Sequence, residues 1–391
     1  MTREAPRDPE PMPATDGPDR GGTPAPRDPE TVGAPGVPPG CYYSAYLRLD
    51  QLLAAQQPAS EAAGKPAHDE MLFITVHQVY ELWFKQILHE LTRIEADFSA
   101  NPVDDRVLGR ITHGLHRMQE ILKLLVHQLD VMETMTPLDF LDFRDLLYPA
   151  SGFQSAQFRE IEIRLGLAGD RRLTFDRAPF ESKLSDADRA RLRRAAERPS
   201  LSDLLDRWLA RTPFVDWGGT SFREAYRAAV VRMLTADAER VRGDAHLSSH
   251  QRAAEALAIE GALKNFAAIF DEGEESSWRM SSRAIEAALL ITLYRDEPAL
   301  NPAFRLLQTL MDVDETMTLW RYRHALMVSR MLGVKVGTGG SSGHDYLRAT
   351  AERHGIFTDL FRLSTYLIPR SALPTLPAPV ARGMGFVYAT Q

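Results

Sequence analysis

Two histidines and one arginine are the residues of this chain whose surroundings are most suited to chemistry. His324 lies in the apolar, Met-rich stretch 317–331, and a glycine-rich segment, Gly-Thr-Gly-Gly-Ser-Ser-Gly, comes after it at 337–343. A neutral imidazole on a rigid helix is a good axial ligand for iron. We expect the glycine-rich segment to act as a lid over whatever binds there, with Thr338 as its polar tip.

The second histidine, His77, lies far upstream in another apolar stretch and has aromatic neighbours. Phe73, Tyr80 and Phe84 fall at i−4, i+3 and i+7, so in a helix they share its face. A neutral imidazole in such a pocket suits a flat, apolar molecule, and one of its nitrogens can accept a hydrogen bond from a ring N–H. An ordinary core histidine explains the pattern at His77 and at His324 equally, so both interpretations stay open from the residues alone.

Arg144 stands just before a turn of small residues, Pro-Ala-Ser-Gly at 149–152. A guanidinium fork beside such a turn is suited to bind a carboxylate through two hydrogen bonds. A surface ion pair with Asp142 or Asp145 explains Arg144 equally well when it is taken alone. The hypothesis is therefore one histidine for a metal, one for a substrate, and an arginine for an acidic group.

Helices must position these residues, because almost the whole chain after residue 40 has a helical pattern. Apolar side chains recur at a helical period over 69–100 and 302–333, the two stretches that carry the histidines. The same period covers 105–133, 138–148, 154–167, 200–211, 221–243, 249–271 and 281–295. Period-two alternation with Asn-Gly or Asp-Gly turns is missing, so a sheet is not expected. The pattern predicts an all-α fold.

The chain is expected to form one helical domain, residues 40–391, behind an N-terminal tail. Residues 1–39 are rich in Pro, Gly, Asp, Glu and Arg and have almost no large apolar side chains, a composition typical of disorder. Breaks after residue 40 are short, which favours a single domain. Within it, the charge-rich stretch 169–220 is a possible peripheral insert.

Composition narrows the class of protein. The net charge of −7 is spread without a basic stripe, so a nucleic-acid partner is not expected. The one cysteine, Cys41, excludes an intramolecular disulfide, covalent haem attachment and a thiolate-rich metal cage. No signal-peptide core is present, and the longest apolar run, 287–294, is shorter than the ~20 residues of a spanning helix. We expect a soluble cytoplasmic protein with no membrane partner.

Several long motifs together resemble the tryptophan 2,3-dioxygenase family. The first, at 68–88, is His-Asp-Glu-x-Leu-Phe-Ile-x-x-His-Gln-x-Tyr-Glu-Leu-Trp-Phe-Lys-Gln-Ile-Leu. The second, at 137–155, is Pro-Leu-Asp-Phe-x-x-Phe-Arg and then Pro-Ala-Ser-Gly-Phe-Gln-Ser. The third, at 320–343, runs from Trp-Arg-Tyr-x-His to the glycine-rich segment, and a fourth, Leu-Ser-Thr-Tyr-Leu-Ile-Pro-Arg, stands at 363–370. The resemblance spans roughly residues 41–380.

The resemblance implies an all-helical subunit that holds haem b, uses O₂ as co-substrate and assembles as a homotetramer. The implied reaction inserts O₂ across the indole C2–C3 bond of L-tryptophan to give N-formylkynurenine. His324 resembles the proximal iron ligand, and His77 the distal histidine that faces the indole N–H. The remaining implied residues contact the substrate or line its pocket: Phe73, Arg144, Ser151, Thr338 and Tyr346, together with Tyr43, Tyr46 and Leu47, which such enzymes lend to a neighbouring subunit's pocket.

Other interpretations of the motifs stay open in the sequence. His344 and Asp345 come directly after the glycine-rich segment, where similar enzymes commonly have Tyr-His, which leaves substrate preference undecided. The rivals are a relative that acts on a substituted tryptophan or inserts one oxygen atom, a non-catalytic haem sensor, and a non-haem iron site of two histidines and a carboxylate. An intact carboxylate anchor argues against the sensor, which needs no amino-acid contact.

Overall fold

The computed structural model describes residues 42–100, 103–167, 184–270, 278–333 and 354–385. The chain divides into two compact units, Met1–Gln57 and Pro58–Gln391. The described part of the first unit holds two short helices, α1 (Tyr43–Leu47) and α2 (Leu49–Leu52). All other described elements belong to the second unit, which contains the two histidines.

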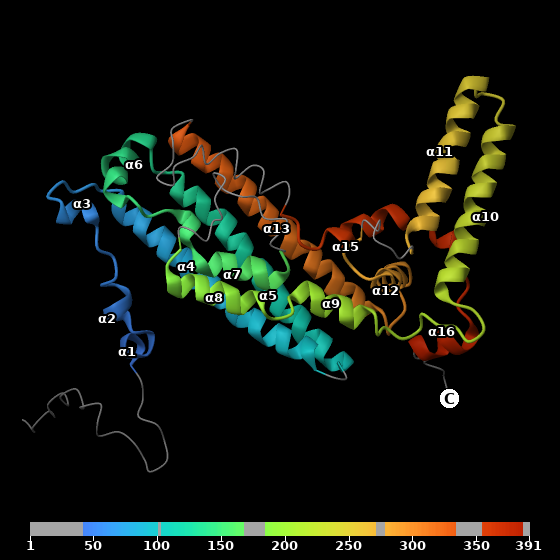
Figure 1. The fold of residues 1–391 in the computed structure, drawn as a ribbon, viewed down its shortest axis with the longest axis horizontal. Helices are drawn as coiled ribbons and strands as arrows, with labels where there is room; N and C mark the ends of the chain where they lie inside the picture. The colour runs from blue at the N-terminus through green and yellow to red at the C-terminus, as the bar shows by residue number, and fades with distance from the viewer. Residues whose placement is uncertain (1–41, 101–102, 168–183, 271–277, 334–353, 386–391) are drawn as a thin grey trace, which may run out of the picture. The chain divides into compact units, whose positions relative to one another are not determined.

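Three long helices form the framework of the second unit. They are α4 (Glu70–Ser99), α5 (Asp105–Met132) and α13 (Asn301–Leu332), and α5 packs against both α4 and α13 (Figure 1). Helix α7 (Ala156–Leu165) packs on α4, and α9 (Leu201–Leu209) packs on α4 and on α12 (Ser282–Leu293). Because each long helix has apolar residues at a helical period, it buries one face against these neighbours.

The other elements surround this framework. Helix α10 (Phe222–Gly243) pairs with α11 (Ser249–Ala268), and α8 (Asp186–Ala196) packs on α7. The remaining elements are short: α3 (Ala59–Ala62), α6 (Pro137–Arg144), η2 (Asp145–Leu147), η3 (Gly152–Gln154), α15 (Thr358–Arg362), η6 (Leu363–Tyr366), η7 (Arg370–Ala372) and α16 (Ala378–Met384). In the described residues, the only β-type pairing is an isolated bridge between Asp216 and Ser221.

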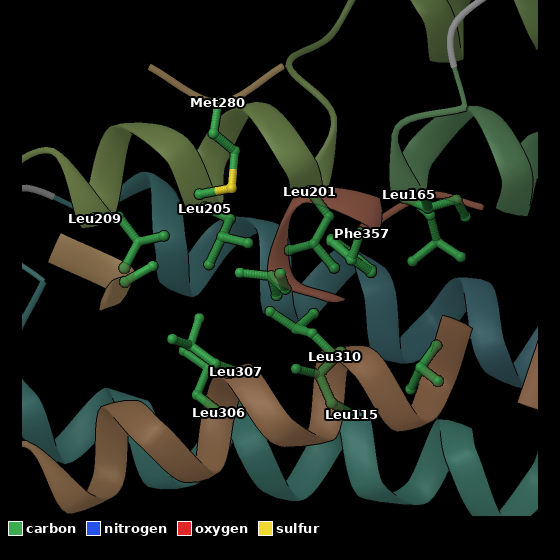
Figure 2. Packing of buried hydrophobic residues seen from close by; sticks show 14 of the residues in the cluster. Leu115, Leu165, Leu201, Leu205, Leu209, Met280, Leu306, Leu307, Leu310 and Phe357 are labelled. Atoms are coloured by element: carbon green, nitrogen blue, oxygen red, sulfur yellow. The ribbon is translucent and has the colours of Figure 1, made fainter. Parts of the chain in front are cut away.

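Leucine, methionine and phenylalanine side chains from several helices fill the core between α4, α5, α9 and α13. Figure 2 shows Leu115 of α5, Leu205 of α9 and Leu310 of α13 pointing toward a common interior. Each of the three is at most 1% exposed. Burial of such a side chain contributes about 1.5–3 kcal/mol relative to its exposure to water. This packing therefore holds the long helices at fixed positions.

Buried polar contacts fix α13 to its neighbours on the side that faces α7. Arg321 forms an ion pair with Glu162 of α7 at 3.0 Å, and both side chains are at most 4% exposed. Further toward the N-terminal end of α13, the Asp314 carboxylate accepts the backbone N–H groups of Ile356 and Phe357, each at 2.8 Å. A buried charge must be paired or hydrogen-bonded, so these contacts constrain the orientation of α13 about its axis.

The all-α prediction is confirmed, and the nine predicted helical stretches correspond to α4, α5, α6 with η2, α7, α9, α10, α11, α12 and α13. Helix α8 and the short C-terminal elements were not predicted, because they are short or highly charged. The stretch 169–220 stays a predicted insert, although α9 within it buries Leu201, Leu205 and Leu209 in the core. Of the described helices, none is long and apolar enough to cross a membrane.

Candidate functional site

His324 lies on α13, one turn after Trp320, and its ring is stacked on the indole of that residue. The two ring centroids are 5.1 Å apart and the planes differ by 7°. Burial, and secondarily the charge on His77, lowers the pKa of His324 to about 4. Among the described residues, neither ring nitrogen has a hydrogen-bond partner. The side chain is thus a neutral imidazole with a lone pair available to a metal ion.

His77 lies on α4, and its ring orientation is fixed by a hydrogen bond within its own helix. Its Nδ1 atom lies 2.7 Å from the Phe73 carbonyl oxygen. Since a carbonyl only accepts, Nδ1 carries the proton and Nε2 has a free lone pair. Burial lowers the pKa of His77, and the Phe73 hydrogen bond and the Glu81 charge oppose this change. His77 is therefore an acceptor through Nε2, and in the folded chain the residue itself is exposed to solvent.

Aromatic side chains cover one side of His77. The Phe73 ring centroid is 4.1 Å from that of His77, and Phe73 itself packs on Phe140 and Phe143 of α6. Tyr80 was predicted to frame His77, but its ring packs against Trp320. Phe73 lies one turn before His77 and Tyr80 about one turn after it, so the two rings meet different neighbours.

Trp320 connects the helices that carry the two histidines. Its Nε1–H donates to the Tyr80 hydroxyl at 3.5 Å, and that hydroxyl donates to the Leu125 carbonyl of α5 at 2.7 Å. The Phe158 ring of α7 packs on the other part of the indole, with centroids 4.9 Å apart. Burial raises the pKa of Tyr80 to about 12, so its hydroxyl stays protonated and keeps donating. The role of Tyr80 and Phe158 beside Trp320 was not predicted from the sequence.

Arg144 and Ser151 lie close together in sequence, on either side of η2. Arg144 is the last residue of α6, a helix that begins with a capping box formed by Thr136 and Asp139. Ser151 lies in the turn before η3, where its N–H donates to the Gln154 side chain at 3.1 Å. Both residues are half-buried. An arginine that is partly shielded from water can bind a carboxylate more strongly than an exposed arginine can.

The other predicted pocket residues are not placed at this site. Thr338 and Tyr346 lie outside the described residues. Tyr43, Tyr46 and Leu47 form most of α1 in the first unit and are 74%, 75% and 40% exposed. Within the described residues, no cluster of three or more His, Cys, Asp or Glu side chains could hold a metal ion, so those residues do not form a site of two histidines and a carboxylate.

The fold and the site together define an all-helical protein in which one neutral histidine can serve as the axial ligand of a haem. The residues present fit that group: His324 has a free nitrogen, a low pKa and an aromatic neighbour that fixes its ring. His77 supplies a second imidazole near His324, since a positive charge on the His77 ring would lower the pKa of His324. Comparison with known proteins gives the particular family.

The chain belongs to the tryptophan 2,3-dioxygenase family, whose model matches residues 34–367. A tryptophan 2,3-dioxygenase of Bdellovibrio bacteriovorus is 49% identical, over 90% of this chain and 99% of that protein. The Dictyostelium discoideum enzyme of the same name is 42% identical over 92% of each chain. The enzyme of Xenopus laevis is 40% identical over 90% of this chain and 87% of its own. The family is haem-dependent and uses O₂ as co-substrate.

Proposed function

We propose that this protein is a haem-dependent dioxygenase that inserts both atoms of O₂ across the indole C2–C3 bond of L-tryptophan, giving N-formylkynurenine. Family membership over most of the chain supports this activity. The observation that carries it in the structure is the placement of two histidines on two long helices: His324 is stacked on Trp320, and His77 has its Nδ1 bonded to the Phe73 carbonyl and its Nε2 free to accept. When bound, ferrous haem supplies the electron transfer that O₂ needs to react with a closed-shell indole.

The roles of the two histidines are inferred from their ring nitrogens. His324 would hold the iron through one nitrogen, since it has no competing hydrogen bond within the described residues. His77 would orient the substrate, because its Nδ1–H is used by the Phe73 carbonyl and its Nε2 remains an acceptor. An indole N–H is a donor and suits that acceptor. His77 therefore acts on the reacting ring, and Phe73 beside it forms one wall of the indole pocket.

The amino-acid end of the substrate would be held away from the histidines. Arg144 would bind its carboxylate, and Ser151 would line the same end of the pocket. Thr338, in the glycine-rich segment, and Tyr346 after it would complete the contacts to the head group. Fixing both ends of the substrate holds the indole plane in one orientation, which removes rotational entropy from the reaction barrier. A close indole amino acid would use the same contacts.

We also propose a cytoplasmic homotetramer in which α1 enters the pocket of a neighbouring subunit. Tyr43, Tyr46 and Leu47 leave an apolar surface exposed within their own unit. Helices α5 and α13 each leave further apolar side chains between 45% and 51% exposed: Leu124 and Val131, and Leu319, Tyr322 and Leu326. Exposed apolar faces of this kind mark protein interfaces. Sedimentation equilibrium of the protein and of Leu326→Glu tests the assembly, and a monomeric parent protein would refute it.

A single-turnover reaction of the reduced protein with L-tryptophan and ¹⁸O₂ tests the activity. We expect a product that carries two labelled oxygen atoms, read by mass spectrometry. One labelled atom would refute dioxygenation and indicate the single-oxygen chemistry that the sequence left open. A haem-loaded protein that makes no product from L-tryptophan but reacts with a ring-substituted tryptophan would refute the proposed substrate. Failure with every indole amino acid would favour a sensor.

A further inference from the structure

We propose that Glu81 is a positioning residue that fixes the turn carrying Ser151 against the helix carrying His77. The proposal rests on the proposed function, in which Ser151 and His77 are two of the residues that face the substrate. Glu81 lies on α4 one turn after His77. It is a half-buried carboxylate that no part of the mechanism above uses.

Glu81 accepts three hydrogen bonds from the beginning of α7. The Ser155 hydroxyl donates to Oε1 at 2.6 Å, and the Gln157 side-chain amide donates to Oε2 at 2.8 Å. The same amide donates to the Glu81 backbone carbonyl at 2.9 Å. Hydrogen bonds to an ionised acceptor are about twice as strong as those between neutral groups. The three bonds therefore form a strong, directional link between α4 and the first turn of α7.

The link continues from Ser155 to Ser151 through the short segment between them. The Ser155 N–H donates to the Gly152 carbonyl at 3.2 Å, and the Gln154 N–H donates to the Ser151 carbonyl at 2.9 Å. The Ser155 hydroxyl also accepts the Phe158 N–H and so caps α7. With both ends of the turn hydrogen-bonded, movement of Ser155 is transmitted to Ser151. Glu81 thereby sets the separation between Ser151 and His77.

A second link between the same two helices provides the control. Glu95 of α4 accepts Nε and Nη2 of Arg164 of α7, each at 2.8 Å. This pair lies about five turns along α4 from His77 and about two turns along α7 from the Ser151 turn. We expect its loss to weaken the packing of α4 on α7 and to leave the turn in place, because the pair lies away from the turn. Glu95→Gln therefore reports a purely structural effect.

Four variants of the full-length holoenzyme test the proposal: Glu81→Ala, Glu81→Gln, the exchange Glu81→Gln with Gln157→Glu, and Glu95→Gln. We expect KM for L-tryptophan to rise roughly tenfold in Glu81→Ala and less in Glu81→Gln, with a smaller change in kcat. The exchange restores an amide-to-carboxylate bond between the side chains at positions 81 and 157, but not the bond to the backbone carbonyl of residue 81, so it should return KM part of the way toward the parent value. Glu95→Gln should leave KM unchanged.

The exchange variant separates positioning from a direct effect of charge on His77. It keeps the link between the two side chains but moves the negative charge from α4 to α7. If Glu81→Ala raises KM and the exchange does not lower it, the positioning role is overturned. An unchanged KM in Glu81→Ala also overturns it, as does a rise in KM that Glu95→Gln matches.

Amide hydrogen exchange of 149–157 gives a readout that needs no turnover. In Glu81→Ala we expect this segment to exchange at least severalfold faster than in the parent protein, and in Glu95→Gln to exchange at the parent rate. Equal exchange in the two variants overturns the proposal. Failure of the parent protein to oxidise L-tryptophan would instead refute the proposed function. The amide hydrogen-exchange rates would still decide whether Glu81 holds the turn.

Discussion

The indole of Trp320 lies parallel to the imidazole of His324, with ring centroids 5.1 Å apart. Trp320 is itself held by the Tyr80 hydroxyl and by the Phe158 ring, which belong to α4 and α7. Rotation of the His324 ring would disturb this stack. The orientation of the proposed iron ligand thus depends on residues of two other helices, a common arrangement around metal-binding histidines.

Replacement of Tyr80 by Phe should weaken haem retention. The variant loses the hydroxyl that joins the Trp320 N–H to the Leu125 carbonyl, at a cost of about 1 kcal/mol. Tyr294→Phe is a matched control, because the buried Tyr294 hydroxyl also donates to a carbonyl, that of Pro374 at 2.6 Å. We expect faster haem transfer to apomyoglobin only from Tyr80→Phe, and a similar loss of unfolding free energy in both. Equal transfer rates would contradict the role of Tyr80.

Replacement of His324 by Ala should abolish haem retention or activity. The variant removes the only nitrogen that the proposal assigns to the iron, so the purified protein should lack the Soret absorbance of the parent. His89→Ala serves as the control, since His89 lies exposed on α4. Partial recovery of the Soret band on addition of imidazole would support the assignment, because a free ligand would then fill the site. Full activity of His324→Ala would rule it out.

Replacement of Arg144 by Ala should weaken L-tryptophan binding by about 2–4 kcal/mol, because the substrate carboxylate would lose its charged partner. Arg144→Lys should fall between the parent and Arg144→Ala, since an ammonium group lacks the two-pronged geometry of guanidinium. The measurement is KM for L-tryptophan alongside that for tryptamine, which lacks the carboxylate. A similar loss for both substrates would argue against a carboxylate contact, and an unchanged KM for L-tryptophan would refute it.

Stability should depend on pH through Glu286 of α12, which is 2% exposed. Burial raises the pKa of this carboxyl, and the opposing charges of Arg223 and Arg283 do not offset it. The folded state holds this proton more tightly than the unfolded chain does, so the protonated Glu286 carboxyl contributes to stability. This contribution is full below about pH 4.5, the pKa of an ordinary glutamate, and is lost as the pH rises through the pKa of Glu286 in the folded protein. Glu286→Gln should remove this loss.

The measurement is the free energy of unfolding of the parent and of Glu286→Gln between pH 5 and 8. We expect the stability of the variant relative to the parent to rise as the pH increases across this range. Glu255→Gln on the exposed face of α11 is the control and should show no such trend. Parallel curves for the parent and Glu286→Gln would mean that Glu286 ionises normally in the folded protein.

Helical periodicity alone predicted the long helices, because each must bury an apolar face. The predicted helix over 302–333 corresponds to α13, Asn301–Leu332, and that over 69–100 to α4, Glu70–Ser99. Helix α8 was missed because its mean hydropathy is low and only Leu192 on it is buried. The predicted helix over 138–148 is an α-helix only as far as Arg144 and continues as the 3₁₀ helix η2. Where a helix ends depends on which groups satisfy its last carbonyls, and periodicity does not identify those groups.

The sequence by itself determined the candidates for the chemistry, since long motifs contain them in a fixed order: His77, Arg144 and His324 stand on or at the end of predicted helices. Only the tertiary structure decided which side chains meet. Tyr80 reaches Trp320 across 240 positions, and Ser155 reaches Glu81 across 74. Such contacts depend on the rotation and crossing of packed helices, which are set by the combined packing of many side chains and not by any local pattern.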